Sequence, residues 1–224
     1  MNMEKKFELT DNFIINAFGV KLFQIKCTKS FKYAKEGDLG GYVEKDENLD
    51  QESDAWVSGN AQVSGNAWVS GNAQVSGNAQ VSGNAQVSGN AWVSGNAQVS
   101  GNARVSGDAE VYGNARVFGN ARVFGNAEVS GDAEVSGNAR VSGDAEIDNN
   151  NKHCGFDCFG SANRHTHAYL TKENKVEITC GCFRGSIEEF EKRVEETHSG
   201  TIYEKQYKAI IDVLKIKFGL TDLI

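Results

Sequence analysis

The feature that most constrains the fold is a run of sixteen nearly identical hexapeptides, from Ala55 to about Asp148. Each copy reads Ala-x-Val-Ser-Gly-Asn with few departures. Alanine and valine lie two positions apart, so both side chains point to one side of a short strand and the intervening side chain points outward. The Ser-Gly-Asn segment tolerates the backbone angles of a tight corner. Because such short strands bury nothing alone, the copies must stack into a solenoid.

The repeat resembles the hexapeptide repeat of left-handed parallel β-helices, a fold found in many acyltransferases. In that fold three hexapeptides make one coil, which implies roughly five coils and a length of about 25 Å at ~4.8 Å per coil. We therefore expect a mainly β protein with three parts. An N-terminal β cap covers residues 1–50, the left-handed β-helix covers residues 51–150, and a small α+β module covers residues 151–224.

The two flanking segments show weaker patterns. Before the repeats, alternation of apolar and polar residues predicts strands at Lys5–Thr10 and Val20–Phe31, and Gly37–Tyr42 reads as a tight loop. After the repeats, His165–Leu170 and Lys175–Cys182 resemble a hairpin.

Two helices are expected to follow this hairpin. Ser186 with Glu189, and Thr201 with Glu204, have the spacing of capping boxes, and each pair precedes an apolar stripe. The C-terminal module is thus expected to be ββαα.

Motifs in both flanks carry a second resemblance. Gly37-Asp38-Leu39-Gly40-Gly41-Tyr42-Val43-Glu44 is similar to the N-terminal segment of hexapeptide-repeat proteins common in bacteriophages and prophages. Gly160-Ser161-x-Asn163 and Cys180-Gly181-Cys182-Phe183-x-Gly185 resemble the C-terminal module of the same proteins. The resemblance implies a protein encoded by a phage or prophage, and it supplies no established activity.

With eighteen residues per coil, every third hexapeptide shares a face. The glutamate face carries Trp56, Gln74, Trp92, Glu110, Glu128 and Glu146. The mixed face carries Gln62, Gln80, Gln98, Arg116 and Glu134. The arginine face carries Trp68, Gln86, Arg104, Arg122 and Arg140. One hypothesis is a parallel homotrimer in which the glutamates of one subunit oppose the arginines of the next. The alternative is that both faces are simply solvated.

Aromatic residues replace the corner serine in three successive hexapeptides, at Tyr112, Phe118 and Phe124. They predict an aromatic belt around one level of the solenoid. Exposed aromatic side chains often mark contact surfaces, which makes this belt a second candidate for an oligomer interface. A local packing variant explains the same residues equally well.

Catalysis by the repeats is not indicated. Hexapeptide acyltransferases typically use a histidine base in or beside the coils, whereas all four histidines here lie beyond the repeats, at His153, His165, His167 and His198. His198, at a predicted helix end, is the only candidate base. We therefore expect a non-enzymatic protein, with an acyltransferase as the alternative.

Cysteine ligation of zinc is the other chemistry to weigh. Cys154 with Cys158, and Cys180 with Cys182, have C-x3-C and C-x-C spacings, unlike the usual C-x2-C pairs of zinc sites. We expect no metal and no cofactor, and Cys180 and Cys182 fit equally well as small core residues.

Charge and hydropathy exclude several classes of protein. The net charge of −7 argues against nucleic-acid binding, which needs clustered positive charge. No apolar run is long enough for a transmembrane helix, and the start of the chain has no apolar core of a secretion signal. Five cysteines without disulfide-like spacing suit a reducing compartment, so we expect the bacterial host cytoplasm.

These observations favour a phage accessory protein in which the solenoid is a rigid scaffold and the C-terminal module carries recognition. The target is open between a host protein, a small signalling nucleotide of host antiviral defence, and a component of the virion. For a small ligand, the candidate polar contacts are Ser161, Asn163, Arg164 and His198.

Overall fold

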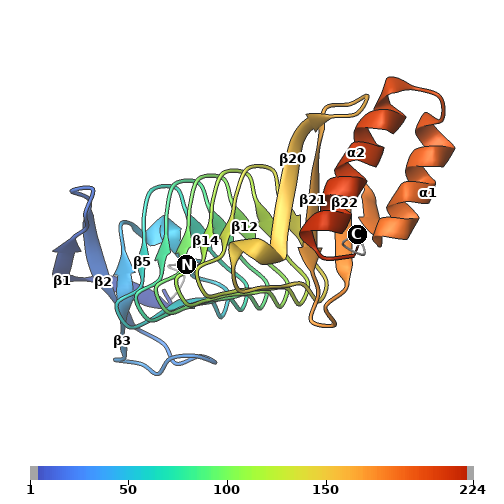
Figure 1. The fold of residues 1–224 in the computed structure, drawn as a ribbon. Coiled ribbons are helices and arrows are strands. Elements are labelled where there is room, and N and C mark those ends of the chain that lie inside the picture. Colours follow the sequence, from blue (N-terminus) through green and yellow to red (C-terminus); the bar gives the residue numbers. More distant parts are fainter. Residues whose placement is uncertain (1–4, 221–224) are drawn as a thin grey trace.

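A computed structural model describes residues 5–220. The molecule is elongated and has three parts, which follow one another in chain order (Figure 1). A small N-terminal β structure leads into a parallel β-solenoid, and a sheet with two helices closes the far end. The predicted fold class, a β-solenoid between N-terminal strands and a small C-terminal α+β module, is confirmed.

Sixteen two-residue strands, β4 to β19, form the three faces of the solenoid. The glutamate face contains β4 (Trp56–Val57), β7 (Gln74–Val75), β10 (Trp92–Val93), β13 (Glu110–Val111), β16 (Glu128–Val129) and β19 (Glu146–Ile147). The mixed face contains β5 (Gln62–Val63), β8 (Gln80–Val81), β11 (Gln98–Val99), β14 (Arg116–Val117) and β17 (Glu134–Val135). The arginine face contains β6 (Trp68–Val69), β9 (Gln86–Val87), β12 (Arg104–Val105), β15 (Arg122–Val123) and β18 (Arg140–Val141). Neighbouring strands on each face pair in parallel, eighteen residues apart.

The interior of the solenoid is filled by the two small apolar residues of each repeat. Every repeat alanine and valine, and Ile147, is at most 2% exposed. Backbone amides of the strands donate hydrogen bonds to carbonyls of the next coil. The Trp92 amide, for example, donates to the Ala109 carbonyl at 2.9 Å. The repeated Ala/Val spacing therefore produces one continuous core and a regular backbone ladder.

The corners of the coils depend on glycine and asparagine. The repeat glycines from Gly59 to Gly143 have φ between +58° and +73°, the left-handed region that alanine enters only with strain. An asparagine follows most of these glycines and stacks on its equivalent in the next coil, so that the Asn66 amide donates to Asn84 Oδ1 at 3.2 Å. The same ladder continues through Asn102 and Asn120 to Asn138.

The N-terminal cap continues the mixed face. Its strands are β1 (Phe7–Ile15), β2 (Lys21–Cys27) and β3 (Leu39–Val43), followed by a 3-10 turn at Asp46–Asn48. The strand order β1-β2-β3-β5 attaches the cap to the solenoid sheet. The buried Lys6 ammonium donates to the carbonyls of Asp50, Ser53 and Ala55 at 2.6–2.8 Å. These bonds satisfy carbonyls of the chain that leads into the first coil.

The predicted loop at Gly37–Tyr42 is in part wrong, because β3 begins at Leu39. Gly40 and Gly41 lie so close to the core that a Cβ on either would fall within 2.8 Å of neighbouring atoms. The glycines therefore allow close packing of a strand, which a sequence pattern cannot distinguish from a turn. β1 also runs further than predicted, to Ile15, and β2 ends earlier, at Cys27.

The C-terminal module contains a four-stranded antiparallel sheet, so the predicted ββαα order is wrong. Its strands are β20 (His153–Phe159), β21 (Arg164–Leu170), β22 (Val176–Cys180) and β23 (Phe183–Gly185), in that spatial order, and a 3-10 turn at Asn150–Lys152 precedes them. The expected hairpin is β21–β22. The sequence pattern did not predict β20, because this strand contains glycine and aspartate and is interrupted at Cys158, where φ is +64°.

Both helices begin where the capping boxes predict. α1 (Ile187–His198) starts after Ser186, whose hydroxyl accepts from the Glu189 amide while the Glu189 carboxylate accepts from the Ser186 amide. α2 (Ile202–Lys217) starts after Thr201, whose hydroxyl accepts from the Glu204 amide. Within residues 5–220, neither helix has the length and apolar content to cross a bilayer. The first four residues, on which part of the secretion-signal expectation rests, lie outside the described range.

The module sheet separates the solenoid from the helices (Figure 1). Tyr169 belongs to the solenoid core cluster, whereas Ala168 and Ile178 pack with the helix residues. The sheet thus has a solenoid-facing side and a helix-facing side, and each side positions a separate group of polar residues.

Candidate ligand-binding site

A cavity lies on the helix-facing side of the module, where β21, β22 and β23 meet α1 and α2. Its volume is about 790 Å³, within the range of small-molecule sites. Strand residues such as Arg164 and Phe183 form one wall, and helix residues such as Lys192 and His198 form the other. We refer to it as the module cavity.

Aromatic rings line the module cavity. Phe183 and Phe190 pack with ring centroids 5.1 Å apart, and Tyr207 meets Phe190 edge-on at 5.6 Å. The imidazole of His198 stacks on the Tyr207 ring, with centroids 5.5 Å apart. Burial raises the pKa of the Tyr207 hydroxyl to about 12, with a smaller contribution from Cys180. The tyrosine therefore stays neutral, and its buried ring supports His198 at the cavity wall.

The position of Tyr207 depends on the turn between β20 and β21. Gly160 has φ of +73°, and its Cα lies against the Tyr207 hydroxyl, where any Cβ would clash. The Gly160 amide also donates to Gln206 Oε1 at 3.0 Å. These contacts hold the Gly160–Asn163 turn to α2, which places Ser161 at the cavity wall.

Two cations in the module cavity have no acidic partner. Arg184 is bound by Glu177, and Arg193 lies 3.8 Å from Glu196. Within residues 5–220, neither Arg164 nor Lys192 has a carboxylate partner, and both are exposed. An unpaired guanidinium and an unpaired ammonium beside an aromatic wall form a favourable environment for an anionic ligand.

Three of the four predicted ligand contacts line the module cavity, namely Ser161, Arg164 and His198. Asn163 does not line it, and instead occupies the left-handed region at φ +47° in the adjoining turn. Sequence reasoning missed Lys192 and Tyr207. Tyr207 belongs to the apolar stripe predicted for the second helix, and nothing in the sequence showed that Lys192 on α1 faces the sheet.

The four C-terminal cysteines are spread over different environments. Cys180 and Cys182 line the module cavity, and Cys180 Sγ accepts from the Thr166 hydroxyl at 3.3 Å. Cys154 packs beside the helices with a pKa raised by burial, and Cys158 is exposed. Among residues 5–220, no group of three or more His, Cys, Asp or Glu side chains is arranged to hold a metal ion.

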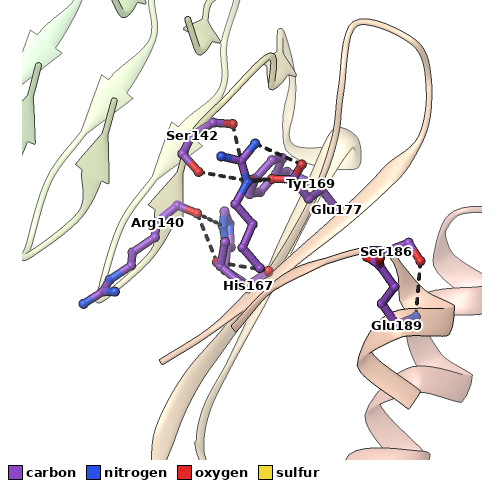
Figure 2. A network of polar contacts seen from close by, with 9 residues as sticks. Arg140, Ser142, His167, Tyr169, Glu177, Ser186 and Glu189 are labelled. Carbon is purple, nitrogen blue, oxygen red and sulfur yellow. Dashed lines mark hydrogen bonds and ion pairs between the residues drawn. The ribbon is translucent and has the colours of Figure 1, made fainter. Parts of the chain in front are cut away.

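The solenoid-facing side of the module forms a buried polar network (Figure 2). The Tyr169 hydroxyl donates to Glu177 at 2.5 Å and lies 3.2 Å from the Ser142 hydroxyl. His167 Nδ1 lies 3.3 Å from the Arg140 carbonyl, and the Thr179 hydroxyl donates to the same carbonyl at 3.2 Å. These contacts join the module to the coil that contains β18.

A histidine pair adds to this network. His153 Nδ1 and His167 Nε2 lie 3.0 Å apart. Because the Arg140 carbonyl can only accept, His167 carries its proton on Nδ1 and its Nε2 accepts from His153. Burial lowers the pKa of His153 to about 4 and that of His167 to about 3, with the neighbouring histidine adding to the second shift. Both rings are therefore neutral near pH 7.

This pair predicts loss of stability in mild acid. The unfolded histidines take up protons below the ordinary pKa of 6.5, whereas the folded ones resist until about pH 4. The contribution of these histidines to the free energy of unfolding is therefore fully present above pH 6.5. It falls as the pH drops from 6.5 towards 4, by at most ~1.4 kcal/mol per pH unit for each histidine. Chemical denaturation at pH 7.5, 6 and 5 measures the slope. His153→Gln should flatten it and His198→Gln should not, and equal slopes in all three proteins would contradict the assignment.

The two predicted charge columns lie as the spacing requires. Arg104, Arg122 and Arg140 are in register on the arginine face, and Glu110, Glu128 and Glu146 are in register on the glutamate face. Two of the glutamates have partners within the chain, since Lys172 binds Glu128 and Lys152 lies 3.3 Å from Glu146. The arginine column has no carboxylate partner among the described residues.

The three corner aromatics occupy one coil, each directly after a strand of a different face. Tyr112 and Phe118 are half-buried, and Phe124 is 37% exposed. The Tyr112 hydroxyl donates to Glu128 at 3.4 Å, and Arg116 stacks over the Phe118 ring at 5.4 Å. Neighbouring outward side chains therefore cover part of this belt.

Comparison with known proteins supports the solenoid alone. The family described as YdcK beta solenoid repeat matches residues 61–77, 79–95, 97–113 and 109–125. A search of curated proteins gives no match. The match falls within the stacked coils, where residues repeat every eighteen positions. Over this stretch the chain is a β-solenoid repeat protein.

Proposed function

We propose that this chain is a binding protein in which the β-solenoid is a rigid scaffold and the C-terminal module binds a small anionic ligand. The observation that carries the proposal is the module cavity, where Arg164 and Lys192 have no acidic partner beside the stacked rings of His198 and Tyr207. The regularity of the solenoid supports the scaffold role, since the coils repeat the same core and corner and place their differences on the outer faces.

A nucleotide is the ligand class that this cavity fits best. The aromatic wall offers a stacking surface for a base, and the two free cations offer charge-assisted hydrogen bonds to phosphate oxygens. The volume of about 790 Å³ accommodates a nucleotide. We propose that the chain acts by sequestering such a ligand rather than by catalysis. In a phage or prophage setting the ligand would be a signalling nucleotide of host defence, and a host protein is the alternative target.

The nucleotide proposal is tested by isothermal titration of the full chain with AMP and, in parallel, with adenosine. We expect AMP to bind and adenosine to bind at least tenfold more weakly, because only AMP engages the cations. Lys192→Gln should weaken AMP binding about tenfold, or about 1.4 kcal/mol. Lys205→Gln is the matched control, since Lys205 is an exposed lysine of the same module that does not line the cavity. Equal affinity for AMP and adenosine would contradict the proposal.

We further propose that the scaffold assembles as a parallel trimer through its charge columns. Arg104 precedes Glu110 by one hexapeptide, so in a cyclic assembly the two lie at nearly the same height, within ~1.6 Å for a 4.8 Å coil. Glu110 forms no ion pair among the described residues, and only the longer-range charge of Lys172 acts on it. Light scattering should give a trimer for the wild type, dissociation for Arg104→Glu, and recovery in Arg104→Glu/Glu110→Arg. A wild-type monomer at low salt would end the trimer proposal.

A further inference from the structure

A second, smaller cavity lies where the arginine face of the solenoid meets the module. Its volume is about 280 Å³. Asn138 and Arg140 contribute from the coil of β18, and Arg164, His165, Thr179 and Gly181 contribute from the module. We refer to it as the junction cavity. It is distinct from the module cavity, although Arg164 lines both.

One glycine positions two guanidinium groups at this cavity. The Gly181 carbonyl accepts from Arg140 Nη1 at 3.0 Å. On its other side Gly181 has φ of +62°, and a Cβ there would lie 2.7 Å from Arg164 Nη1. Arg164 therefore lies flat against the turn, in space that only glycine leaves open. Arg140 and Arg164 come from segments far apart in the sequence and converge on a single residue.

The charge around the junction cavity is unbalanced. No acidic side chain lines it, and neither guanidinium has a carboxylate partner among residues 5–220. Arg122 stacks directly on Arg140 from the preceding coil and adds a third positive charge. The Asp157 carboxylate is 2.7 Å from Nδ1 of His165, which lines the cavity, and is therefore occupied by that contact. Like charges held together in this way destabilise one another unless an anion lies between them.

Further hydrogen-bond donors complete the cavity. Asn138 accepts on Oδ1 from Asn120 at 3.2 Å, which leaves its amide hydrogens available. Arg140 uses only one of its five N–H groups on Gly181. Buried Thr179 and largely buried His165 also line the cavity, and the Thr179 hydroxyl already donates to the Arg140 carbonyl. The remaining guanidinium donors match the tetrahedral oxygens of a phosphate.

We infer that the junction cavity binds a phosphate group between Arg140 of the solenoid and Arg164 of the module. The bound phosphate links the two parts of the chain, because each part contributes one guanidinium. The site goes beyond the proposed function of the module cavity and does not depend on it. The phosphate is either free inorganic phosphate or a phosphate of a larger ligand that reaches past the shared Arg164.

Thermal unfolding of the full chain in sodium phosphate, against sodium chloride at equal ionic strength, tests the site. We expect a saturable rise in melting temperature with phosphate, and titration calorimetry should give a matching Kd. Arg140→Gln and Arg164→Gln should each weaken phosphate binding at least tenfold. Arg116→Gln is the matched control, because it removes an exposed arginine of the solenoid that lies outside both the cavity and the arginine column. Arg140→Lys keeps the positive charge without the paired N–H groups. Its phosphate affinity should lie between those of the wild type and Arg140→Gln.

Two outcomes overturn the site. One is a phosphate effect that does not saturate, or that Arg116→Gln reduces as much as Arg140→Gln does. The other is no phosphate binding by the wild type. Neither outcome bears on the module cavity, which Lys192→Gln tests separately. If the site holds, AMP affinity that falls in Arg140→Gln identifies a phosphate of a larger ligand, and AMP affinity unchanged in that variant identifies free phosphate.

Discussion

Replacing Gly89 by alanine is expected to lower the free energy of unfolding by about 3 kcal/mol, a large fraction of the stability of a typical domain. Two effects add at this corner. The φ of +70° strains any residue with a Cβ, and the new Cβ would lie 2.9 Å from the Gly107 amide nitrogen in the next coil. The new Cβ is fixed by the backbone that carries it and the Gly107 nitrogen is itself backbone, so no side-chain movement can relieve the contact.

Gly19→Ala is the control that separates strain from crowding. Gly19 has φ of +78° in a hairpin turn, with nothing within 4 Å of a Cβ built there. Alanine at this position should cost only the strain, about 1 kcal/mol. Chemical denaturation of the three proteins measures both changes. If the two variants lose equal stability, close stacking of the corners does not contribute.

The second large effect is expected at Tyr169, where alanine should cost about 4 kcal/mol. Tyr169 is fully buried in the solenoid core cluster although it belongs to β21 of the module. Its ring closes the apolar end of the solenoid, and truncation would leave a cavity beneath the last coil. Tyr169→Phe keeps the ring and should cost only about 1 kcal/mol, because Glu177 retains its bond to Arg184 at 2.5 Å.

Hydrogen exchange locates this effect along the chain. In Tyr169→Ala, the amides of the last coils should exchange faster while those near β4 remain protected, because a solenoid transmits instability mainly to neighbouring repeats. The Tyr169→Phe protein provides the reference pattern. Uniform loss of protection from β4 to β19 would contradict a local role for Tyr169 at the end of the solenoid.

The repeats could be predicted from the sequence because each hexapeptide specifies the same local structure. Ala and Val at a spacing of two, followed by a glycine with positive φ, leave one arrangement that buries the apolar residues, and the faces and their charge columns follow by counting. The capping residues Ser186 and Thr201 were equally predictive, since each acts on the amides of its own first helical turn.

The flanks were harder to predict because their structure depends on distant contacts. β3 forms where Gly40 and Gly41 allow close approach to the core, and β20 forms although Gly155 and Asp157 disfavour a strand. Both strands are stabilised by pairing with neighbours, which a local pattern does not encode.

The candidate site was predictable in part. Ser161, Arg164 and His198 were predicted from the sequence as candidate polar contacts, and they line the same cavity. Lys192 was missed because an exposed lysine on a helix has no sequence signal that separates it from a solvated one. The convergence of Arg140 and Arg164 on Gly181 was also missed, because it joins the last coils to a turn of the module.

We propose that recognition resides in the C-terminal module and that the solenoid is a scaffold. Amide chemical shifts of the isotope-labelled chain, mapped during titration with AMP, show which part binds. We expect saturable shifts in β21 to β23, in α1 near Lys192 and in the Gly160–Asn163 turn, with few changes from β4 to β15. Shifts concentrated on the outer faces of those coils, with none in the module, would contradict the proposal.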